Sequence, residues 1–382
     1  MPNIVPTSKN ILVVAGDVSG DLHASNLVRE IKRINPNVKI TALGGKRLKE
    51  TADNFLFDLA SKGASGFVAP LVKLPLWIKL LKMVRGYLDS EQPACVIVVD
   101  FYGFNSQVLG MAKHRNIPCY YYVAPQVWAS RHNRTKTIAS STKKVITIFP
   151  FEPAFHAKYG SNAVFLGNPL LDIVPQPKEH VFDGTFRLGI LPGSRVGELT
   201  KHTDLFYKTF KEVQKIFPNT KAYLFCVPEF SDEFYLSLIK DSNPQVTLVR
   251  ETDYKERGNM DFLITCSGTA TLENALLGVP MLVAYKMSSI TFKVAKAVIK
   301  VPYISLVNIL AGKEVVKEFI QHFATAKNLS AEVMSYFQNP QKTKKMREQL
   351  LNIRKTLGDP GVAKRAAELI LNDVFANKKQ VL

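Results

Sequence analysis

The chain has 382 residues, of which 46% are hydrophobic and 21% are charged. This composition excludes an intrinsically disordered protein, and at roughly 150 residues per domain the length predicts two or three domains. The 50 lysines and arginines outnumber the 32 acidic residues and give a net charge of +18. Such an excess predicts an anionic partner, namely a nucleic acid, a phosphorylated substrate or an acidic membrane surface.

Targeting and metal-binding signals are missing from the sequence. The N-terminus has neither the basic region nor the long apolar region of a signal peptide, and no stretch reaches the ~18 uninterrupted apolar residues of a spanning helix. The four cysteines form no CxxC pair and no HExxH motif occurs, which argues against a zinc site and a disulfide framework. We therefore expect a cytoplasmic protein without a metal or other cofactor, which can still lie on a membrane surface.

Apolar runs alternate with helical patterns in the first part of the chain. Residues 11–15, 38–43, 95–99, 118–123 and 145–149 form runs that are typical of buried parallel strands. After the first run, Leu27, Val28, Ile31 and Ile34 recur at helical spacing. Strands that alternate with helices predict βαβ units and therefore an open parallel sheet.

The alternation is interrupted at residues 172–178 by two prolines and polar residues, and then restarts. Further strands are predicted at residues 186–191, 221–227, 246–250, 262–265 and 281–285, and terminal helices from about residue 340. The sequence thus predicts an α/β protein with two doubly wound domains, residues 1–172 and 180–340. A C-terminal helical segment, residues 341–382, is expected to pack back on the first domain.

In the first domain, candidate functional residues follow the strands, because ligands of open parallel sheets gather at the carboxyl ends of strands. Residues 16–21 are glycine-rich but match neither dinucleotide nor P-loop spacing, and a tight turn with a capped helix is the alternative. Asp100 ends a strand, where it can act as a catalytic base or cap the next turn. His23 faces the same edge in principle, with a surface or internally bonded histidine as the alternative.

Two loops of the second domain have residues suited to a diphosphate. Arg195, in residues 192–195, lies beside flexible backbone donors and can bind a diphosphate bidentately, unless it is a solvated surface charge. Residues 266–273 read CSGTATLE, so a strand ends, small hydroxyl residues follow and a helix begins, which predicts a phosphate cradle. Glu273 can accept sugar hydroxyls there or be a buried glutamate in a capped helix. Together the loops indicate that this domain holds a nucleotide.

Residues 71–85 combine Trp, Leu, Ile and Met with basic side chains and contain no acid. Such a basic amphipathic stretch can lie in a bilayer interface or bind a lipid chain, and the alternative is a core-facing helix with lysines at its surface. The residues predicted to contact lipid are Leu76, Trp77, Leu80 and Leu81. Residues 286–300 form a second basic, apolar stretch.

The ordered set of loops resembles a known family. Residues 15–23 (AGDVSGDLH), 121–129 (YYVAPQVWA), 149–152 (FPFE), 165–170 (FLGNPL), 191–195 (LPGSR), 267–273 (SGTATLE) and 301–312 (VPYISLVNILAG) follow the order of motifs in the lipid-A-disaccharide synthase family. Any one of these pieces is unspecific, but the ordered set, which spans about residues 11–375, is highly specific.

This resemblance implies a GT-B glycosyltransferase with two Rossmann-like domains and the active cleft between them. The first domain would face the acceptor and the membrane, and the second would bind the nucleotide sugar. The implied inverting reaction joins UDP-2,3-diacylglucosamine to 2,3-diacylglucosamine 1-phosphate (lipid X), giving the β(1→6) lipid A disaccharide 1-phosphate and UDP. It belongs to lipid A and lipopolysaccharide biosynthesis, and its implied place is the anionic cytoplasmic face of the inner membrane. The resemblance also implies a homodimer.

Two alternatives remain at this point. One is a UDP-sugar epimerase or related GT-B enzyme that acts without a lipid acceptor. The other is a nucleic-acid binder, suggested only by the net charge and supported by no RRM, KH or zinc-finger signature; the sequence therefore favours no nucleic acid as a partner.

The resemblance also implies site residues. Asp100 matches the first aspartate of the family's I-D-x-P-D-F-N motif and is the candidate catalytic base, while Arg195 would stabilise the diphosphate as the second catalytic residue. The nucleotide sugar would be held by Ser194, Arg195, Ser267, Gly268, Thr269, Thr271, Glu273 and Asn308. The acceptor loops of the first domain would contribute Gly16, Ser19, Gly20, His23 and Gln126.

The chain departs from the family pattern at four positions. The second aspartate of the I-D-x-P-D-F-N motif is Gly103, and the glutamate of the usual M-G-x-x-E-V is Ala69. The second tryptophan of V-W-A-W is Ser130, and the histidine of G-H-P is Asn168. These departures lie mainly in the half that is expected to bind the acceptor.

Overall fold

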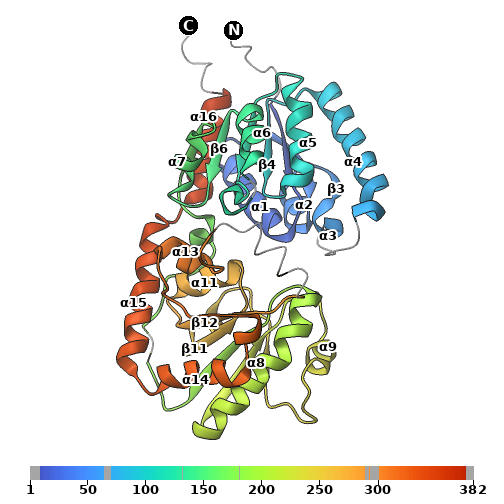
Figure 1. Ribbon diagram of the computed structural model, residues 1–382. Helices are drawn as coiled ribbons and strands as arrows, with labels where there is room; N and C mark the ends of the chain where they lie inside the picture. Colours follow the sequence, from blue (N-terminus) through green and yellow to red (C-terminus); the bar gives the residue numbers. More distant parts are fainter. Residues whose placement is uncertain are drawn as a thin grey trace. The chain divides into compact units, whose positions relative to one another are not determined.

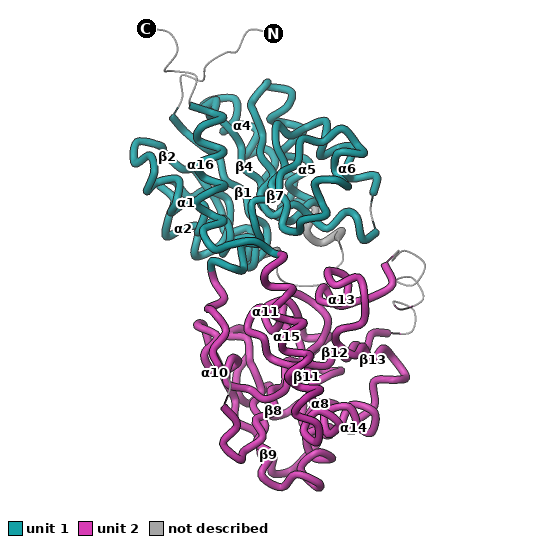
Figure 2. The backbone as a smooth tube through the Cα atoms, turned by 90° about the vertical axis from the view of Figure 1, so that its left-hand side faces the viewer, with its two compact units in different colours: residues 1–172, 357–382 teal, residues 173–356 magenta. Residues whose placement is uncertain are grey.

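The computed structural model describes residues 9–63, 70–130, 132–179, 181–288, 292 and 301–375. The chain divides into two compact units, shown in different colours in Figure 2. Unit 1 comprises residues 1–172 and 357–382, and unit 2 comprises residues 173–356. All four cysteines are buried free thiols. None of the helices in the described ranges is both long and apolar enough to cross a membrane.

Unit 1 is built on a seven-stranded parallel sheet with the order β3-β2-β1-β4-β5-β6-β7. Its strands are β1 (Asn10–Ala15), β2 (Lys39–Gly44), β3 (Asn54–Asp58), β4 (Cys95–Val99), β5 (Cys119–Tyr122), β6 (Lys144–Thr147) and β7 (Ala163–Phe165). The strand order reverses between β1 and β4, which pair in parallel with Ala15 opposite Val99. This reversal is the topological switch point, where open sheets of this kind bind ligands.

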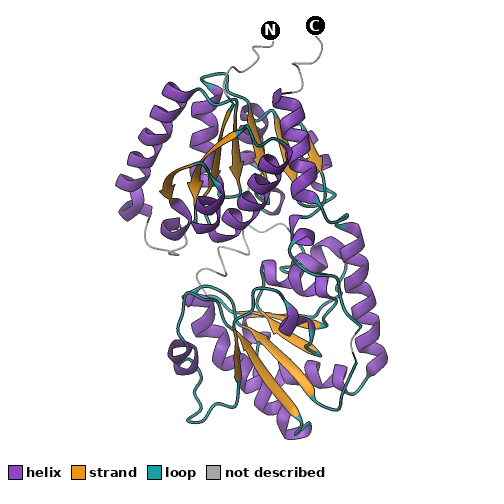
Figure 3. Cartoon of the chain, turned by 180° about the vertical axis from the view of Figure 1, so that it is seen from behind, coloured by secondary structure: helices purple, strands orange, loops and turns teal. Residues whose placement is uncertain are grey.

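Helices cover both faces of this sheet (Figures 1 and 3). They are α1 (Val18–Ile34), α2 (Lys46–Thr51), α3 (Leu59–Gly63), α4 (Pro70–Glu91), α5 (Tyr102–Lys113), α6 (Asn133–Ser141), α7 (Glu152–Ala157) and α16 (Val362–Phe375), with short 3-10 turns at Val127–Ala129 and Pro169–Asp172. Alternate residues of β1 enter two separate cores: Ile11 and Val13 pack toward α1 and α16, whereas Leu12 and Val14 pack toward α4 and α5. This two-sided burial explains the unbroken apolar strand runs.

Unit 2 has a six-stranded parallel sheet with the order β10-β9-β8-β11-β12-β13. Its strands are β8 (Phe186–Leu191), β9 (Thr220–Phe225), β10 (Thr247–Val249), β11 (Phe262–Thr265), β12 (Met281–Tyr285) and β13 (Glu318–Ile320). Its helices are α8 (Val196–Ile216), α9 (Asp232–Ser237), α10 (Lys255–Gly258), α11 (Thr269–Leu277), α13 (Leu306–Ala311), α14 (Ala326–Phe337) and α15 (Pro340–Thr356), with a 3-10 turn at Gln321–Phe323. The strand order reverses between β8 and β11, so each unit has one switch point. The predicted pair of Rossmann-like domains is confirmed.

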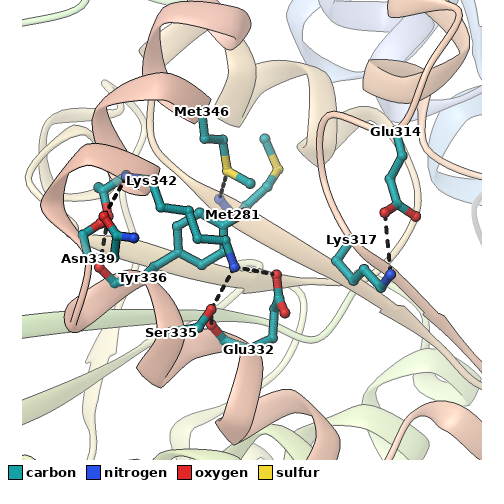
Figure 4. Close-up of polar contacts among 10 residues, drawn as sticks. Met281, Glu314, Lys317, Glu332, Ser335, Tyr336, Asn339, Lys342 and Met346 are labelled. Atoms are coloured by element: carbon teal, nitrogen blue, oxygen red, sulfur yellow. Dashed lines mark hydrogen bonds and ion pairs between the residues drawn. The ribbon is translucent and has the colours of Figure 1, made fainter.

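The C-terminal helices are divided between the units. Helix α15 is anchored in unit 2: Figure 4 shows Lys342, whose Nζ lies 3.9 Å from the centre of the Tyr336 ring and 2.6 Å from Ser335 Oγ on α14. In the same view Met346 Sδ accepts a hydrogen bond of 3.3 Å from the backbone N–H of Met281, the first residue of β12.

Helix α16 returns to unit 1, where it packs against α1. The carboxylate of Asp172, the last residue of the first segment of unit 1, accepts hydrogen bonds from the backbone N–H groups of Gly361, Val362 and Ala363 at the start of α16. In addition, Asn168 N–H donates to the carbonyl of Leu357 at 2.9 Å. The points at which the chain leaves and re-enters unit 1 are therefore bonded to each other.

Candidate functional site

The first candidate region lies at the switch point of unit 1, where Asp100 follows β4. Asp100 and Phe101 both adopt left-handed backbone conformations, with φ of 45° and 41°, which cost about 1–3 kcal/mol each in non-glycine residues. Hydrogen bonds hold this turn: the Tyr121 hydroxyl donates to the Asp100 carbonyl at 2.6 Å, and Asn105 Nδ2 donates to it at 2.8 Å. Strain that the surroundings maintain in this way is characteristic of functional positions.

A second carboxylate lies near Asp100. Asp17 caps α1: its Oδ1 accepts hydrogen bonds from Gly20 N–H at 2.6 Å and from Ser19 Oγ at 3.2 Å. Burial first, and the nearby Asp17 charge second, raise the pKa of Asp100 to about 7. A carboxylate with a pKa near neutrality can accept a proton from a hydroxyl and release it again, as a general base must.

The predicted acceptor-loop residues form the turn that supports this switch point. Gly16 lies under the ring of Phe101, because a Cβ at Gly16 would lie 2.0 Å from the Phe101 Cδ1. Gly20 is buried and Ser19 is exposed, and both bond to the capping carboxylate of Asp17. The structure therefore brings Gly16, Ser19 and Gly20 to the same strand ends as Asp100.

His23 and Gln126 have different surroundings. His23 is buried, and desolvation lowers its pKa to about 4, which keeps the ring neutral at physiological pH. Its Nδ1 has no hydrogen-bond partner among the described residues, and the charged group acting on it is Asp172. Gln126 is exposed and precedes the 3-10 turn Val127–Ala129 without a side-chain capping bond. The structure does not bond either residue to Asp100.

The motifs YYVAPQVWA and FPFE meet at a buried carboxylate. Glu152 Oε1 accepts a hydrogen bond of 2.8 Å from Trp128 Nε1, and its Oε2 accepts from the backbone N–H groups of Ile148 and Phe149. Burial raises the pKa of Glu152 to about 7, although these hydrogen bonds act in the opposite direction. Glu152 therefore joins these two motifs within unit 1.

The second candidate region lies at the switch point of unit 2, where two loops leave neighbouring strands. Leu191 of β8 is paired with Thr265 of β11, and Cys266 N–H donates to the Leu191 carbonyl at 3.0 Å. The 192–195 loop and the 266–269 loop therefore start side by side. Arg195 and Thr269 are both exposed, with 68% of the Arg195 side chain accessible. The structure thus brings the predicted guanidinium and the predicted phosphate cradle to the carboxyl ends of the neighbouring strands β8 and β11.

Glu198, which the sequence analysis missed, is bonded to the 192–195 loop. Its Oε2 accepts hydrogen bonds from the backbone N–H groups of Ser194 (3.2 Å) and Arg195 (3.4 Å). Its Oε1 accepts from Arg195 Nη1 at 3.0 Å and from the Tyr285 hydroxyl at 3.3 Å. Gly193 permits this approach, because a Cβ there would lie 2.6 Å from Glu198 Oε2. The sequence signature of a capping box has Ser or Thr at the N-cap, and because the N-cap here is Arg195, the glutamate three residues later gave no such signal.

His202, one helical turn after Glu198, is hydrogen-bonded to the same loop. Its Nε2 lies 2.9 Å from the backbone N–H of Lys286 and must accept from it, so the proton is on Nδ1, which donates to the Pro192 carbonyl at 3.0 Å. Desolvation lowers the pKa of His202, in agreement with a neutral ring. Both residues on α8 thus fix the 192–195 loop against the end of β12.

The hydroxyls of the 266–269 loop and its helix bond internally. Ser267 Oγ donates to the Ile304 carbonyl at 2.7 Å, and the buried Thr271 Oγ1 donates to the Gly268 carbonyl at 2.8 Å. Gly268, the N-cap of α11, is exposed with φ of 149°, and the space where a Cβ would point is open. Because the first amides of a helix have no acceptor within it, the donors available to an anion here are backbone N–H groups rather than these hydroxyls.

Glu273 and Asn308 are both bonded to protein groups. Glu273 Oε2 accepts a hydrogen bond of 2.6 Å from Arg257 Nη1, and Arg257 also pairs with Glu251. Asn308 is fully buried; its Nδ2 donates to the Val316 carbonyl and to Glu318 Oε1, both at 2.8 Å. The Asn308 Oδ1 accepts from two backbone N–H groups. Asn308 thus organises the turn before β13, and its amide has no free hydrogen-bonding group.

The residues predicted to contact lipid lie on α4. Leu80 is fully buried in the core of unit 1, so it is unavailable to lipid, and this part of the prediction is corrected. Leu76, Trp77 and Leu81 are partly buried against the same core. The Trp77 ring contacts the rings of Phe101 and Phe104 at centroid distances of 6.1 and 5.8 Å. Trp77 therefore packs beside the Asp100 turn.

Lys79, Lys82 and Arg85 lie on the exposed side of α4. The second basic stretch, residues 286–300, lies largely outside the described residues, as does Ala69. Within the described ranges, no group of three or more His, Cys, Asp or Glu side chains could hold a metal ion.

Comparison with solved structures shows the fold. A UDP-GlcNAc 2-epimerase from Neisseria meningitidis, solved with bound UDP-GlcNAc, superposes with a TM-score of 0.64 at 15% identity, covering 95% of this chain and 100% of that one. MurG from Acinetobacter baumannii superposes with a TM-score of 0.60 at 14% identity, covering 95% of this chain and 99% of that one. At these identities the likeness establishes the GT-B architecture alone.

Comparison of sequences shows the family. The family model described as lipid-A-disaccharide synthetase matches residues 11–372. The lipid-A-disaccharide synthase of Geobacter sulfurreducens is 34% identical over 373 residues, covering 96% of this chain and 97% of its own length. That of Syntrophus aciditrophicus is 34% identical over 377 residues, covering 95% and 97%. With two switch points of the expected kind and relatives that match over nearly their whole length, the chain belongs to the lipid-A-disaccharide synthase family.

Proposed function

We propose that the chain is an inverting glycosyltransferase that joins UDP-2,3-diacylglucosamine to lipid X, forming the β(1→6) lipid A disaccharide 1-phosphate and UDP. The observation that carries this proposal is the pair of neighbouring loops after β8 and β11. These loops present a guanidinium and a helix N-terminus at the carboxyl ends of the two strands. Family membership over nearly the whole chain supports the same reaction.

Asp100 is the proposed base. In the reaction, the 6-hydroxyl oxygen of lipid X forms a bond to C1 of the donor sugar while the bond from C1 to the diphosphate oxygen breaks. The hydroxyl proton passes to the Asp100 carboxylate, and UDP leaves with the electron pair. A pKa of about 7 for Asp100 suits this transfer at neutral pH. The left-handed turn at Asp100 and Phe101 keeps the carboxylate at the strand end.

The diphosphate is the group that gains negative charge as the bond to C1 breaks. Preorganised donors aimed at such a group lower the barrier without further reorganisation. We assign this role to Arg195 and to the first backbone N–H groups of α11, with Ser194 and Gly268 supplying backbone in the same two loops. Glu273 is the proposed acceptor of sugar hydroxyls, and its Arg257 partner fixes its position. Asn308, Ser267 and Thr271 support the loops through their internal hydrogen bonds.

Unit 1 is proposed to bind the acceptor at the anionic cytoplasmic face of the inner membrane. The net charge of +18 favours such a surface, and the exposed basic side of α4 supplies three of the positive charges. Leu76, Trp77 and Leu81 are the proposed lipid-contacting residues that remain once Leu80 is removed. A homodimer is also proposed, on the family relation alone.

The decisive experiment incubates purified protein with both acylated sugars and identifies the products by mass spectrometry, with an Asp100→Ala variant alongside. The expected products are UDP and the disaccharide 1-phosphate, with little of either from the variant. Turnover of the UDP-sugar without lipid X would contradict the proposal and favour an epimerase. Equal turnover by the variant would remove Asp100 from the mechanism and leave the reaction itself intact.

A further inference from the structure

The donors around the 192–195 loop already bind an anionic group that belongs to the protein. The carboxylate of Glu198 accepts hydrogen bonds from two backbone N–H groups, those of Ser194 and Arg195, and pairs with the Arg195 guanidinium. Two backbone amides and one guanidinium form a donor set suited to one phosphate group. An internal carboxylate therefore occupies the place where the proposed diphosphate would bind.

A capping box alone does not account for this arrangement. Within a capping box, the N3 side chain accepts one hydrogen bond, from the N-cap backbone N–H, which here is that of Arg195. Glu198 accepts in addition from Ser194 N–H, one residue earlier, and from the guanidinium, whose side chain is 68% exposed. The carboxylate thus accepts from three donors of the loop, namely two backbone N–H groups and the Arg195 guanidinium.

The lengths of these bonds favour exchange. The bonds to Ser194 N–H and Arg195 N–H are 3.2 and 3.4 Å long, beyond the 2.7–2.9 Å that is usual for charge-assisted bonds, so each is weak. A diphosphate carries more charge than a carboxylate and forms shorter bonds to the same donors. A diphosphate and the Glu198 carboxylate would repel each other at the same donors, so the binding of one disfavours the binding of the other.

Glu198 has a second partner that does not belong to the loop. The Tyr285 hydroxyl, at the end of β12, donates to Glu198 Oε1 at 3.3 Å. A carboxylate that gives up the loop amides therefore keeps one hydrogen bond, and its side chain is already mostly buried, with 12% accessible. This contact lowers the cost of moving Glu198 away from the loop.

We propose that Glu198 is an internal substitute for the diphosphate, which holds the 192–195 loop and Arg195 in place in the ligand-free protein and gives up these donors when the nucleotide sugar binds. After transfer, the returning carboxylate competes with UDP and so favours its release. Glu198 is a positioning residue on this account. Its role rests on the proposed UDP-sugar transfer, and titrations with UDP and pyrophosphate separate the two.

The test compares the Kd values of UDP, inorganic pyrophosphate and uridine, measured by titration calorimetry, for the wild type and a Glu198→Gln variant. Glutamine keeps the size and one acceptor oxygen but removes the competing charge. UDP and pyrophosphate should bind about two- to fivefold more tightly to the variant, the range expected when one partly exposed charge pair is lost, and uridine equally. Glu212→Gln is the matched control, since Glu212 lies on the same helix in an exposed pair with Lys215.

Each outcome decides the question. Equal or weaker UDP binding by Glu198→Gln, with UDP binding intact in the wild type, would overturn the role of Glu198 and leave the proposed function standing. A wild type that binds neither UDP nor pyrophosphate would overturn both. A structure of the wild-type protein with UDP provides a measurement that needs no variant. The carboxylate of Glu198 should then have left the N–H groups of Ser194 and Arg195, and a complex in which it still accepts from them would contradict the proposal.

Discussion

The two switch points share one topology and differ in chemistry. In unit 1, the strand ends carry two carboxylates: Asp17, which caps α1, and Asp100, which lies on a turn with strained backbone beside aromatic side chains. In unit 2, the strand ends carry glycines, a helix N-terminus and the exposed Arg195. On the proposed function, the fold supplies a place for a ligand twice, and the residues after each strand decide whether that place accepts protons or stabilises anions.

The largest expected effect tests the unit 1 side of this comparison. Asp100→Asn keeps the size of the side chain but removes its ability to accept a proton. Turnover should fall about 10²- to 10⁴-fold, the usual contribution of a general base, while the Kd of UDP stays unchanged because UDP binding is assigned to unit 2. Steady-state kinetics and calorimetry measure the two quantities. A large loss of UDP affinity in this variant would show that the division of roles between the units is wrong.

Arg195→Ala tests the unit 2 side of the comparison. Turnover should fall about 10²- to 10³-fold, since one preorganised group that stabilises the leaving diphosphate is lost. In contrast to Asp100→Asn, the affinity for UDP should also fall. Arg187→Ala, which changes an arginine of β8 paired with Asp183, is the control. Wild-type turnover in the Arg195 variant would exclude Arg195 from the mechanism.

The pH dependence sharpens the assignment of the base. With the pKa of Asp100 raised to about 7, the carboxyl is protonated below that pH and cannot accept the hydroxyl proton. The value of kcat/KM should therefore fall by about tenfold per pH unit below neutrality and level off above it.

Asp17→Asn should move the midpoint of this profile to lower pH, because a negative charge that raises the pKa of Asp100 is removed. Asparagine caps a helix as well as aspartate, so α1 should remain intact. Glu30→Gln, on the same helix in an exposed pair with Arg33, should leave the midpoint in place. A profile that Asp17→Asn does not move would show that this carboxylate has no influence on the base.

The smallest expected effect concerns the membrane. If the exposed side of α4 contacts anionic lipid, Lys82→Gln should weaken binding to phosphatidylserine vesicles about fivefold, since each basic residue near such a surface contributes about 1 kcal/mol. Lys215→Gln in unit 2, an exposed lysine on α8, is the matched control. An equal loss in both variants, measured by co-sedimentation, would mean that net charge rather than α4 determines binding.

Much of the fold could be predicted from the sequence because the central strands are buried on both faces and appear as unbroken apolar runs. The strands β3, β7 and β13 were missed, since they lie at sheet edges and their side chains are only partly buried or exposed. The predicted strand 246–250 is shorter in the structure, Thr247–Val249. Such edge strands form because a neighbouring strand offers hydrogen bonds, and this neighbour is invisible to local sequence patterns.

The candidate site was predictable in its positions and less so in its bonds. The sequence placed Asp100, Arg195 and the SGT motif after strands, where the structure has them. It gave no sign of the left-handed backbone at Asp100 and Phe101, which depends on Tyr121 and Asn105 from other segments. The internal bonds of Asn308 likewise arise from residues seven to ten positions later in the chain. These features depend on tertiary contacts rather than on residue type.

Asp172 precedes unit 2 in the sequence, and its carboxylate accepts hydrogen bonds from the start of α16, which follows unit 2. This contact bears on the origin and the engineering of the chain. Residues 173–356 form one continuous insertion in unit 1, between two points of the chain that are hydrogen-bonded to each other. Excising residues 173–356 and joining residue 172 to residue 357 would leave the seven strands of the unit 1 sheet together with α16, the helix that packs against α1, so unit 1 can be tested for folding on its own.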